Sequence, residues 1–126
     1  EVTLVNEMLT QMESFSGVFV ASTNLMQGLD QAALRRFDLK VKFDFLKLDQ
    51  ADELLRRYCV SLGVPMPQAQ VVTAVRRLPT LTPGDFAAVA RQNRFRPFTD
   101  AQQLISALKS ECLLKEDVKR AIGFTV

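Results

Sequence analysis

Histidine and tryptophan are absent from this sequence, and only two cysteines and one tyrosine occur among its 126 residues. Without histidine, no Ser-His or Cys-His pair is available to activate a nucleophile. Histidine and cysteine are also the usual ligands of zinc, so a transition-metal site has almost no ligands to draw on. The sequence therefore argues against zinc hydrolases and against hydrolases that use a histidine-activated nucleophile.

Long apolar runs and strong net charge are lacking as well. No run approaches the roughly 20 apolar residues of a membrane-spanning helix, and no charged-then-apolar leader is visible. The net charge of +2 gives no reason to expect a nucleic acid partner. Because the sequence begins with Glu1 rather than Met, we expect a piece of a longer chain. Cys59 and Cys112 lie in apolar helical patterns, which predicts two reduced core thiols in a cytoplasmic protein.

The residues that are present predict two parts, 1–46 and 47–126. The first has apolar residues at helical spacing over residues 1–14. Residues 18–22 are a short apolar run, typical of a strand buried on both faces of a parallel sheet. Residues 39–43 alternate apolar and basic side chains, as in a strand with one wet face. Asp30 is expected to cap a helical turn between these strands.

All of the signals in the second part are helical. Gly63, Thr82 and Asp100 mark a helix end, a helix start and a helix cap, respectively. Apolar side chains at helical spacing lie between these signals. The sequence therefore predicts a small bundle, with helices over residues 49–62 and 68–78, from Pro83, from Asp100, and over residues 116–121.

Residues 18–38 contain the pattern that first indicates a function. The apolar run ends at Asn24, a helical turn follows, and Arg35 and Arg36 come directly after that turn. An amide at the end of a buried strand, followed by paired arginines on a turn, indicates phosphate chemistry, because guanidinium groups fork onto phosphate oxygens.

The order of four motifs resembles the AAA family of ATPases. The matching segments are VNEMLTQME at residues 5–13, TN at 23–24, LDQAALR at 29–35 and RFD at 36–38. One such motif alone would carry no information, but this order and spacing are specific. The resemblance implies that residues 1–46 are the C-terminal part of the AAA ATPase core: an α/β fragment made of a helix plus two strands of a parallel P-loop NTPase sheet.

The second part resembles the helical lid domain of the same family. Residues 82–89, TPGDFAAV, are similar to the lid motif S/T-G-A-D-L-x-x-L. The resemblance implies that residues 47–126 form an all-α lid, so that the fold as a whole is mainly helical. It covers residues 1–93 and is weaker beyond them.

The resemblance also implies roles for polar residues of the first part. Asn24 stands at sensor 1, which orients the attacking water or touches the γ-phosphate; the other interpretation is an asparagine that caps a strand or turn. Arg35 and Arg36 stand at the arginine fingers, which act on nucleotide held by the next subunit of a ring, typically a hexamer. The family separates its two arginines, whereas these abut. Which of them reaches the phosphate stays open, and so does a salt bridge to Asp38.

Three residues of the second part match positions near the nucleotide in the family. Pro83 and Gly84 correspond to lid backbone that lies against the nucleotide, and Tyr58 to a ring near adenine and ribose. The alternative interpretations are structural: Pro83 and Gly84 would form a helix start, and Tyr58 would be a core residue.

Two motifs of the family are missing from the sequence. They are the loop G-x-x-x-x-G-K-S/T, which cradles phosphates, and the apolar strand ending in Asp-Glu, which holds Mg²⁺. The chain alone is therefore expected to bind ATP poorly and to hydrolyse none, with both motifs upstream of Glu1. For the parent protein the resemblance implies ATP and Mg²⁺ as cofactors, ATP hydrolysis in a homo-oligomeric ring, and a protein substrate that is remodelled.

Two other functions belong to different classes. A non-catalytic helical module for protein interaction or oligomerisation fits the missing phosphate loop. A nucleic-acid binder would use Arg91, Arg94, Phe95 and Arg96 as a basic-aromatic patch. For that segment we favour solvated arginines beside a buried Phe95.

Overall fold

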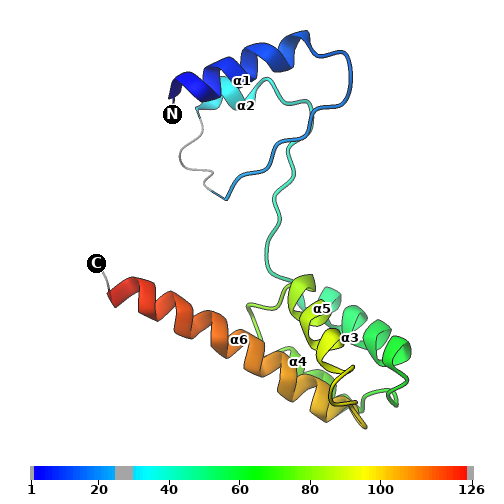
Figure 1. The fold of residues 1–126 in the computed structure, drawn as a ribbon. Coiled ribbons are helices and arrows are strands. Elements are labelled where there is room, and N and C mark those ends of the chain that lie inside the picture. The colour runs from blue at the N-terminus through cyan, green and yellow to red at the C-terminus, as the bar shows by residue number, and fades with distance from the viewer. Residues whose placement is uncertain (1, 25–29, 125–126) are drawn as a thin grey trace. The chain divides into compact units, whose positions relative to one another are not determined.

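A computed structural model of the chain describes residues 2–24 and 30–124 (Figure 1). Leu29 of the LD motif lies outside these ranges. The described residues fold into two compact units, residues 1–42 and 43–126. None of the described helices is long and apolar enough to cross a membrane. The helices are α1 (Val2–Ser14), α2 (Gln31–Leu34), α3 (Leu48–Leu62), α4 (Ala69–Val75), α5 (Pro83–Gln92) and α6 (Ala101–Phe124).

The predicted α/β fragment is wrong. Neither residues 18–22 nor residues 39–43 form a strand, and no sheet occurs in the described ranges. Their apolar side chains are open to solvent; Val18 is 89% and Phe43 91% exposed. A strand persists only where a neighbouring strand takes up its backbone hydrogen bonds, and the described residues supply no such neighbour. The broader prediction of a mainly helical chain is confirmed.

The first unit is built around α1 and the single turn α2. Asp30 caps α2 as predicted, because its Oδ1 accepts a hydrogen bond from the backbone N–H of Ala32 at 3.1 Å. Leu9 of α1 and Ala33 of α2 are the buried apolar side chains among the residues whose burial is described in this unit. These two side chains are the part of this unit's core that the described residues show.

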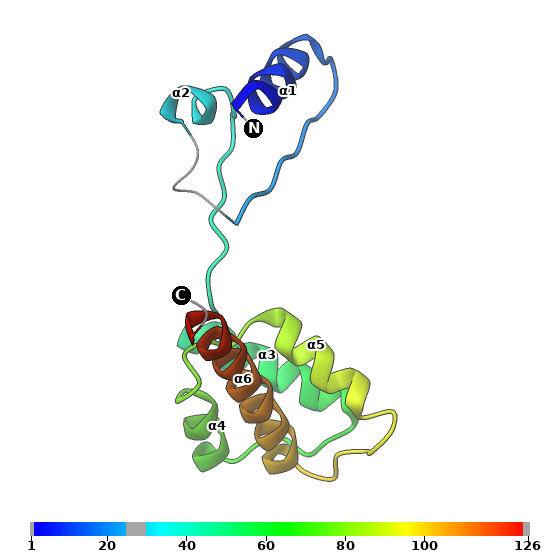
Figure 2. The same cartoon turned by 60° about the vertical axis from the view of Figure 1, so that its left-hand side comes forward.

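The second unit is a four-helix bundle (Figures 1 and 2). Helix α3 packs against α4 and α5, and α6 packs against the same two helices, so the four contacts close a ring around one core. An ion pair of 2.6 Å from Arg76 to Asp52 adds a link between α4 and α3. The core consists of Ala51, Leu55, Cys59, Val64, Val75, Leu81, Phe86, Val89, Ala101, Leu104, Ile105, Leu108 and Cys112.

Both cysteines lie in this core as free thiols. Burial raises the pKa of Cys59 and of Cys112, because a thiolate loses its hydration there. At neutral pH both side chains therefore remain protonated and act as small apolar residues.

The helix ends of the bundle follow the sequence signals, with two exceptions. Gly63 ends α3 in the left-handed conformation, with φ of 67°, and Thr82 caps α5 with Pro83 as its first residue. Helix α4 is shorter than predicted and ends at Val75. A proline disfavours the helical conformation of the residue before it, so the helix cannot continue up to Pro79. The prediction of a separate helix over residues 116–121 is wrong. No Gly or Pro interrupts residues 101–122, so α6 continues through this segment.

Candidate functional site

The two adjacent arginines lie on the turn at the end of α2. Arg35 is the C-cap of this helix, and the backbone N–H of Arg36 donates to the carbonyl of Ala33 at 3.2 Å. Both arginine residues are exposed. The turn therefore presents two guanidinium groups at the surface of the first unit, where they are accessible to an anion.

Arg36 forms an ion pair with Glu13 of α1. Its Nε lies 3.3 Å from Oε1 of Glu13, and the two side chains are 40% and 58% exposed. The salt bridge considered from the sequence had Asp38 as the partner, so the structure points to a different acid. Exposed pairs of this kind contribute about 0–1 kcal/mol, which means that Arg36 can exchange Glu13 for a phosphate at little cost.

Asn24 is an exposed residue at a bend, and it ends the first described range. The ring of Phe19 lies 6.4 Å from that of Phe37, so the segment before Asn24 approaches the residue after Arg36. Among the described residues, no hydrogen bond or ion pair joins Asn24 to either arginine. The structure therefore brings the two motifs into one compact unit without a direct contact.

The N-terminus of α5 holds Pro83 and Gly84, both exposed. A reciprocal capping box fixes this turn: Oγ1 of Thr82 accepts from the backbone N–H of Asp85 at 3.3 Å, and Oδ2 of Asp85 accepts from that of Thr82 at 2.8 Å. A Cβ on Gly84 would meet only Oγ1 of Thr82, at 3.5 Å, which is an ordinary contact. Packing within the chain therefore does not require glycine here.

Asp85 accepts several side-chain and backbone hydrogen bonds, and it is only 7% exposed. Besides its bonds with Thr82, its Oδ2 accepts from Nζ of Lys115 at 2.7 Å. Nζ of Lys115 also donates to the carbonyl oxygen of Thr80 and lies 5.7 Å from the centre of the Phe45 ring. Lys115 thus ties α6 to the start of α5 and to the segment before α3.

Electrostatics at Asp85 favour the ionised carboxylate. Burial by itself would raise the pKa of this group, but the hydrogen bonds from Lys115 and Thr82, with the positive charge of Lys115, outweigh it and lower the pKa of Asp85. Asp85 is therefore ionised at neutral pH.

The sequence interpretation assigned no role to Lys115, although its position carried a signal. Lys115 follows Leu104, Leu108 and Cys112 at helical spacing, on the face of α6 that is otherwise apolar and buried. A lysine on such a face needs a partner for its charge. Which acid would meet it depended on how α5 and α6 pack.

Tyr58 of α3 is half-buried and stacks on Phe86 of α5. Their ring centres are 5.3 Å apart with an angle of 29° between the planes. The bundle thus brings Tyr58 to the same helix that begins with Pro83 and Gly84. Tyr58 contributes to the edge of the core and keeps part of its surface exposed.

The predicted residues divide between the two units. Asn24, Arg35 and Arg36 belong to the first unit, and Tyr58, Pro83 and Gly84 belong to the second. Each unit thus contains part of the predicted nucleotide site.

The chain is similar to spastin from Anopheles gambiae, with 32% identity over 83 residues. The match covers 66% of this chain but only 10% of the length of spastin, which is an AAA ATPase. No family model matches the chain, and no solved structure matches it. The similarity supports at most a relation to the AAA ATPases, and it assigns no role to an individual residue.

Proposed function

We propose that this chain supplies the sensor 1, arginine-finger and lid elements of an AAA ATPase. The observation that carries the proposal is the ordered series of motifs in residues 5–38 and 82–89, in a chain that is 32% identical to an AAA ATPase over 83 residues. Each motif is short, but their shared order is hard to obtain by chance.

In this proposal the first unit acts on phosphate groups. Asn24 orients the attacking water or touches the γ-phosphate of its own subunit, adding no charge. Arg35 and Arg36 act on nucleotide bound by the neighbouring subunit of a ring, where a permanently charged guanidinium stabilises the charge that develops on the transferred group. The exposure of both arginines supports a role that reaches another molecule.

The second unit would face the nucleotide with the start of α5. The backbone at Pro83 and Gly84 is open to solvent, and Gly84 leaves a space that a Cβ would otherwise take, so a planar base or ribose fits against it. Tyr58 would place its ring near adenine and ribose. These features fit one side of an ATP site.

The rest of the site is assigned to residues outside these 126. No phosphate loop occurs in the sequence, and the described residues contain no group of three side chains able to hold a metal ion. Mg²⁺ and the phosphates would therefore be held by another part of the parent protein. We propose that the parent forms a ring, typically of six subunits, and uses ATP hydrolysis to remodel a protein substrate.

Gly84→Ala separates this proposal from a purely structural role of the α5 start. Since Gly84 is helical and its Cβ position is open, alanine is expected to raise the free energy of unfolding by about 0.5 kcal/mol. In an ATPase-competent protein that contains this chain, the same change is expected to weaken ATP binding about tenfold, because the methyl group occupies the space next to the nucleotide. Urea unfolding and nucleotide titration measure the two effects.

The matched control is Gln70→Ala, at the corresponding second position of α4. It is expected to leave ATP affinity unchanged. Unchanged ATP affinity in Gly84→Ala as well would show that the start of α5 does not face nucleotide.

The 126-residue chain alone is expected to show no ATP-dependent change in its thermal midpoint. A ligand stabilises a fold only in proportion to its binding, and the groups that hold the phosphates are not in this sequence. Differential scanning fluorimetry with and without millimolar Mg-ATP measures this. A shift of several degrees would contradict the division of the site that we propose.

A further inference from the structure

The loop between α5 and α6 is held in one conformation by its own side chains. Oδ1 of Asn93 accepts from the backbone N–H of Phe98 at 2.8 Å, and Oε1 of Gln103 accepts from that of Thr99 at 2.9 Å. Oδ1 of Asp100 accepts from the backbone N–H of Gln103 at 2.8 Å. The loop therefore presents its remaining side chains on a fixed backbone.

This fixed loop exposes an aromatic ring. Phe95 is 91% exposed, so the expectation that it is buried is wrong. Burying such a ring typically stabilises a fold by about 1.5–3 kcal/mol, and the bundle lacks this stabilisation at Phe95. Arg94, Arg96 and Pro97 beside it are exposed as well. An exposed aromatic side chain between two arginines has the composition typical of binding hot spots.

The charge around this ring is uncompensated within its own segment. Residues 86–99 contain three arginines and no acidic residue. None of Arg91, Arg94 and Arg96 forms an ion pair with another described residue. The end of α5 and the loop that follows it therefore form a basic surface that is suited to a negatively charged partner.

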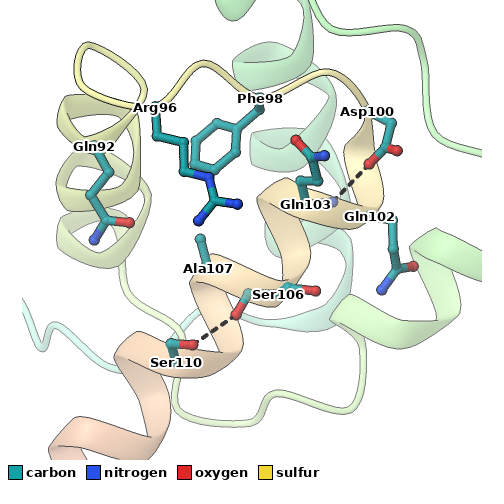
Figure 3. Close-up of a pocket in the computed structure, with 9 residues that line it drawn as sticks. All are labelled: Gln92, Arg96, Phe98, Asp100, Gln102, Gln103, Ser106, Ala107 and Ser110. Carbon is teal, nitrogen blue, oxygen red and sulfur yellow. Dashed lines mark hydrogen bonds between the residues drawn. The ribbon is translucent and has the colours of Figure 1, made fainter.

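A cavity of about 420 Å³ adjoins the loop, between α5 and α6. Figure 3 shows the guanidinium of Arg96 extending over this cavity towards Ala107. The lining surface is largely apolar, but five of the nine lining residues carry a side-chain amide or hydroxyl. Such groups both donate and accept hydrogen bonds, as the backbone of a bound peptide requires. The lining residues are Gln92, Arg96, Phe98, Asp100, Gln102, Gln103, Ser106, Ala107 and Ser110.

We propose that the basic loop of residues 94–98 and the adjoining cavity bind an acidic peptide segment of a partner protein. A carboxylate of the peptide pairs with Arg96, and an apolar side chain packs on Phe95. The peptide backbone bonds to the side chains of Gln102 and Ser106 in the cavity. Arg91 and Arg94 attract the remaining acidic side chains.

The surroundings of the cavity favour a peptide over a nucleic acid. Asp100 lies at the cavity, and Glu111 of α6 accepts a hydrogen bond from Gln92 at 2.9 Å. These carboxylates would repel a continuous phosphate backbone, whereas a peptide with spaced acidic side chains avoids them. The proposed surface is independent of nucleotide, so its test needs no ATP.

The test is fluorescence anisotropy of the full 126-residue chain with a labelled peptide in which glutamates alternate with serines on both sides of one central phenylalanine. Wild-type protein is expected to bind this peptide, more weakly as salt is raised, and to bind the analogue with glutamine in place of glutamate at least about tenfold more weakly. Arg96→Glu and Phe95→Ala are each expected to weaken binding about tenfold. Both residues are exposed, so circular dichroism and the thermal midpoint should be unchanged.

Arg56→Glu is the matched control, because it makes the same charge change at an exposed position of α3. It is expected to keep wild-type affinity. The proposal is overturned if the glutamate and glutamine peptides bind equally, or if Arg96→Glu binds like Arg56→Glu. Tighter binding of a labelled single-stranded oligothymidylate, lost in the same loop variants, would assign the surface to nucleic acid and also overturn it.

Discussion

Arg36→Ala is expected to lower ATP turnover by about a thousandfold in an ATPase-competent protein that contains this chain. A guanidinium that reaches the phosphates of the next subunit stabilises charge in the transition state, and alanine removes that interaction entirely. Nucleotide affinity should change little, because in the proposed role the arginine contacts only nucleotide held by the next subunit. Steady-state turnover and nucleotide titration, measured on the same preparation, separate the two effects.

Arg35→Ala is the companion variant, since the two arginines abut and the proposal assigns the contact with phosphate to this pair. Arg56→Ala serves as the control, as an exposed arginine of the bundle. If both single variants at the turn keep turnover within about twofold of wild type, neither arginine is a finger.

A loss of turnover in Arg36→Ala would not come from unfolding. The only ion pair of Arg36 with another described residue is the exposed one with Glu13, and such pairs contribute about 0–1 kcal/mol. Glu13→Gln removes the same pair while it keeps the arginine. It should therefore match Arg36→Ala in thermal midpoint and match wild type in turnover.

Asp85→Ala is expected to lower the free energy of unfolding by about 2–3 kcal/mol. The change removes the acceptor for the backbone N–H of Thr82 and leaves the ammonium of Lys115 without its carboxylate, in the part-buried site where α5 meets α6. The side chain of Lys115 is 38% exposed, so water replaces part of the lost interaction and keeps the cost below that of a fully buried pair. Urea unfolding of the 126-residue chain measures the loss.

Asp100→Ala is the matched control for this experiment. Asp100 caps α6 but is exposed and lacks a lysine partner, so its loss should cost only about 1 kcal/mol. Equal costs for the two variants would show that the bond to Lys115 contributes nothing. In a double-mutant cycle with Lys115→Met, the two changes should be non-additive, because they remove the same contact.

The pH dependence of the Asp85 contribution follows from the direction of its pKa shift. The pKa of Asp85 is lowered in the folded protein, so the folded state binds this proton less readily than the unfolded state, in which the pKa is about 3.9. The stabilisation is fully present above the unfolded pKa and is lost as the pH falls through the lowered folded pKa. The stability difference between wild type and Asp85→Asn should therefore shrink as the pH falls below about 4.

The helix ends of the bundle show which features of the fold local sequence signals can predict. Gly63, Thr82 and Asp100 end, start and cap helices as predicted, because each acts on the backbone within a few residues of itself. The apolar face of α6 was also visible as a spacing of side chains. Helix continuation was harder to predict: residues 116–121 resemble a helix of their own, yet nothing between them and the preceding helix breaks it.

The two predicted strands show the limit of the same signals. Residues 18–22 and 39–43 have strand-like composition, but a strand is defined by its neighbours, and composition cannot supply them. The same holds for Phe95: a phenylalanine predicts burial on average, whereas the bonds that fix the loop from Asn93 to Asp100 place this ring in solvent.

The sequence by itself determined most of the helix ends in the bundle and contains the order of motifs that resembles the AAA ATPases, because these depend on residues close together in the chain. Only the tertiary structure decided that Lys115 meets Asp85, that Arg36 pairs with Glu13, and that Arg96 overhangs a cavity between α5 and α6. Those contacts join residues far apart in the sequence. They depend on how the helices pack, which the periodicity of a single helix does not specify.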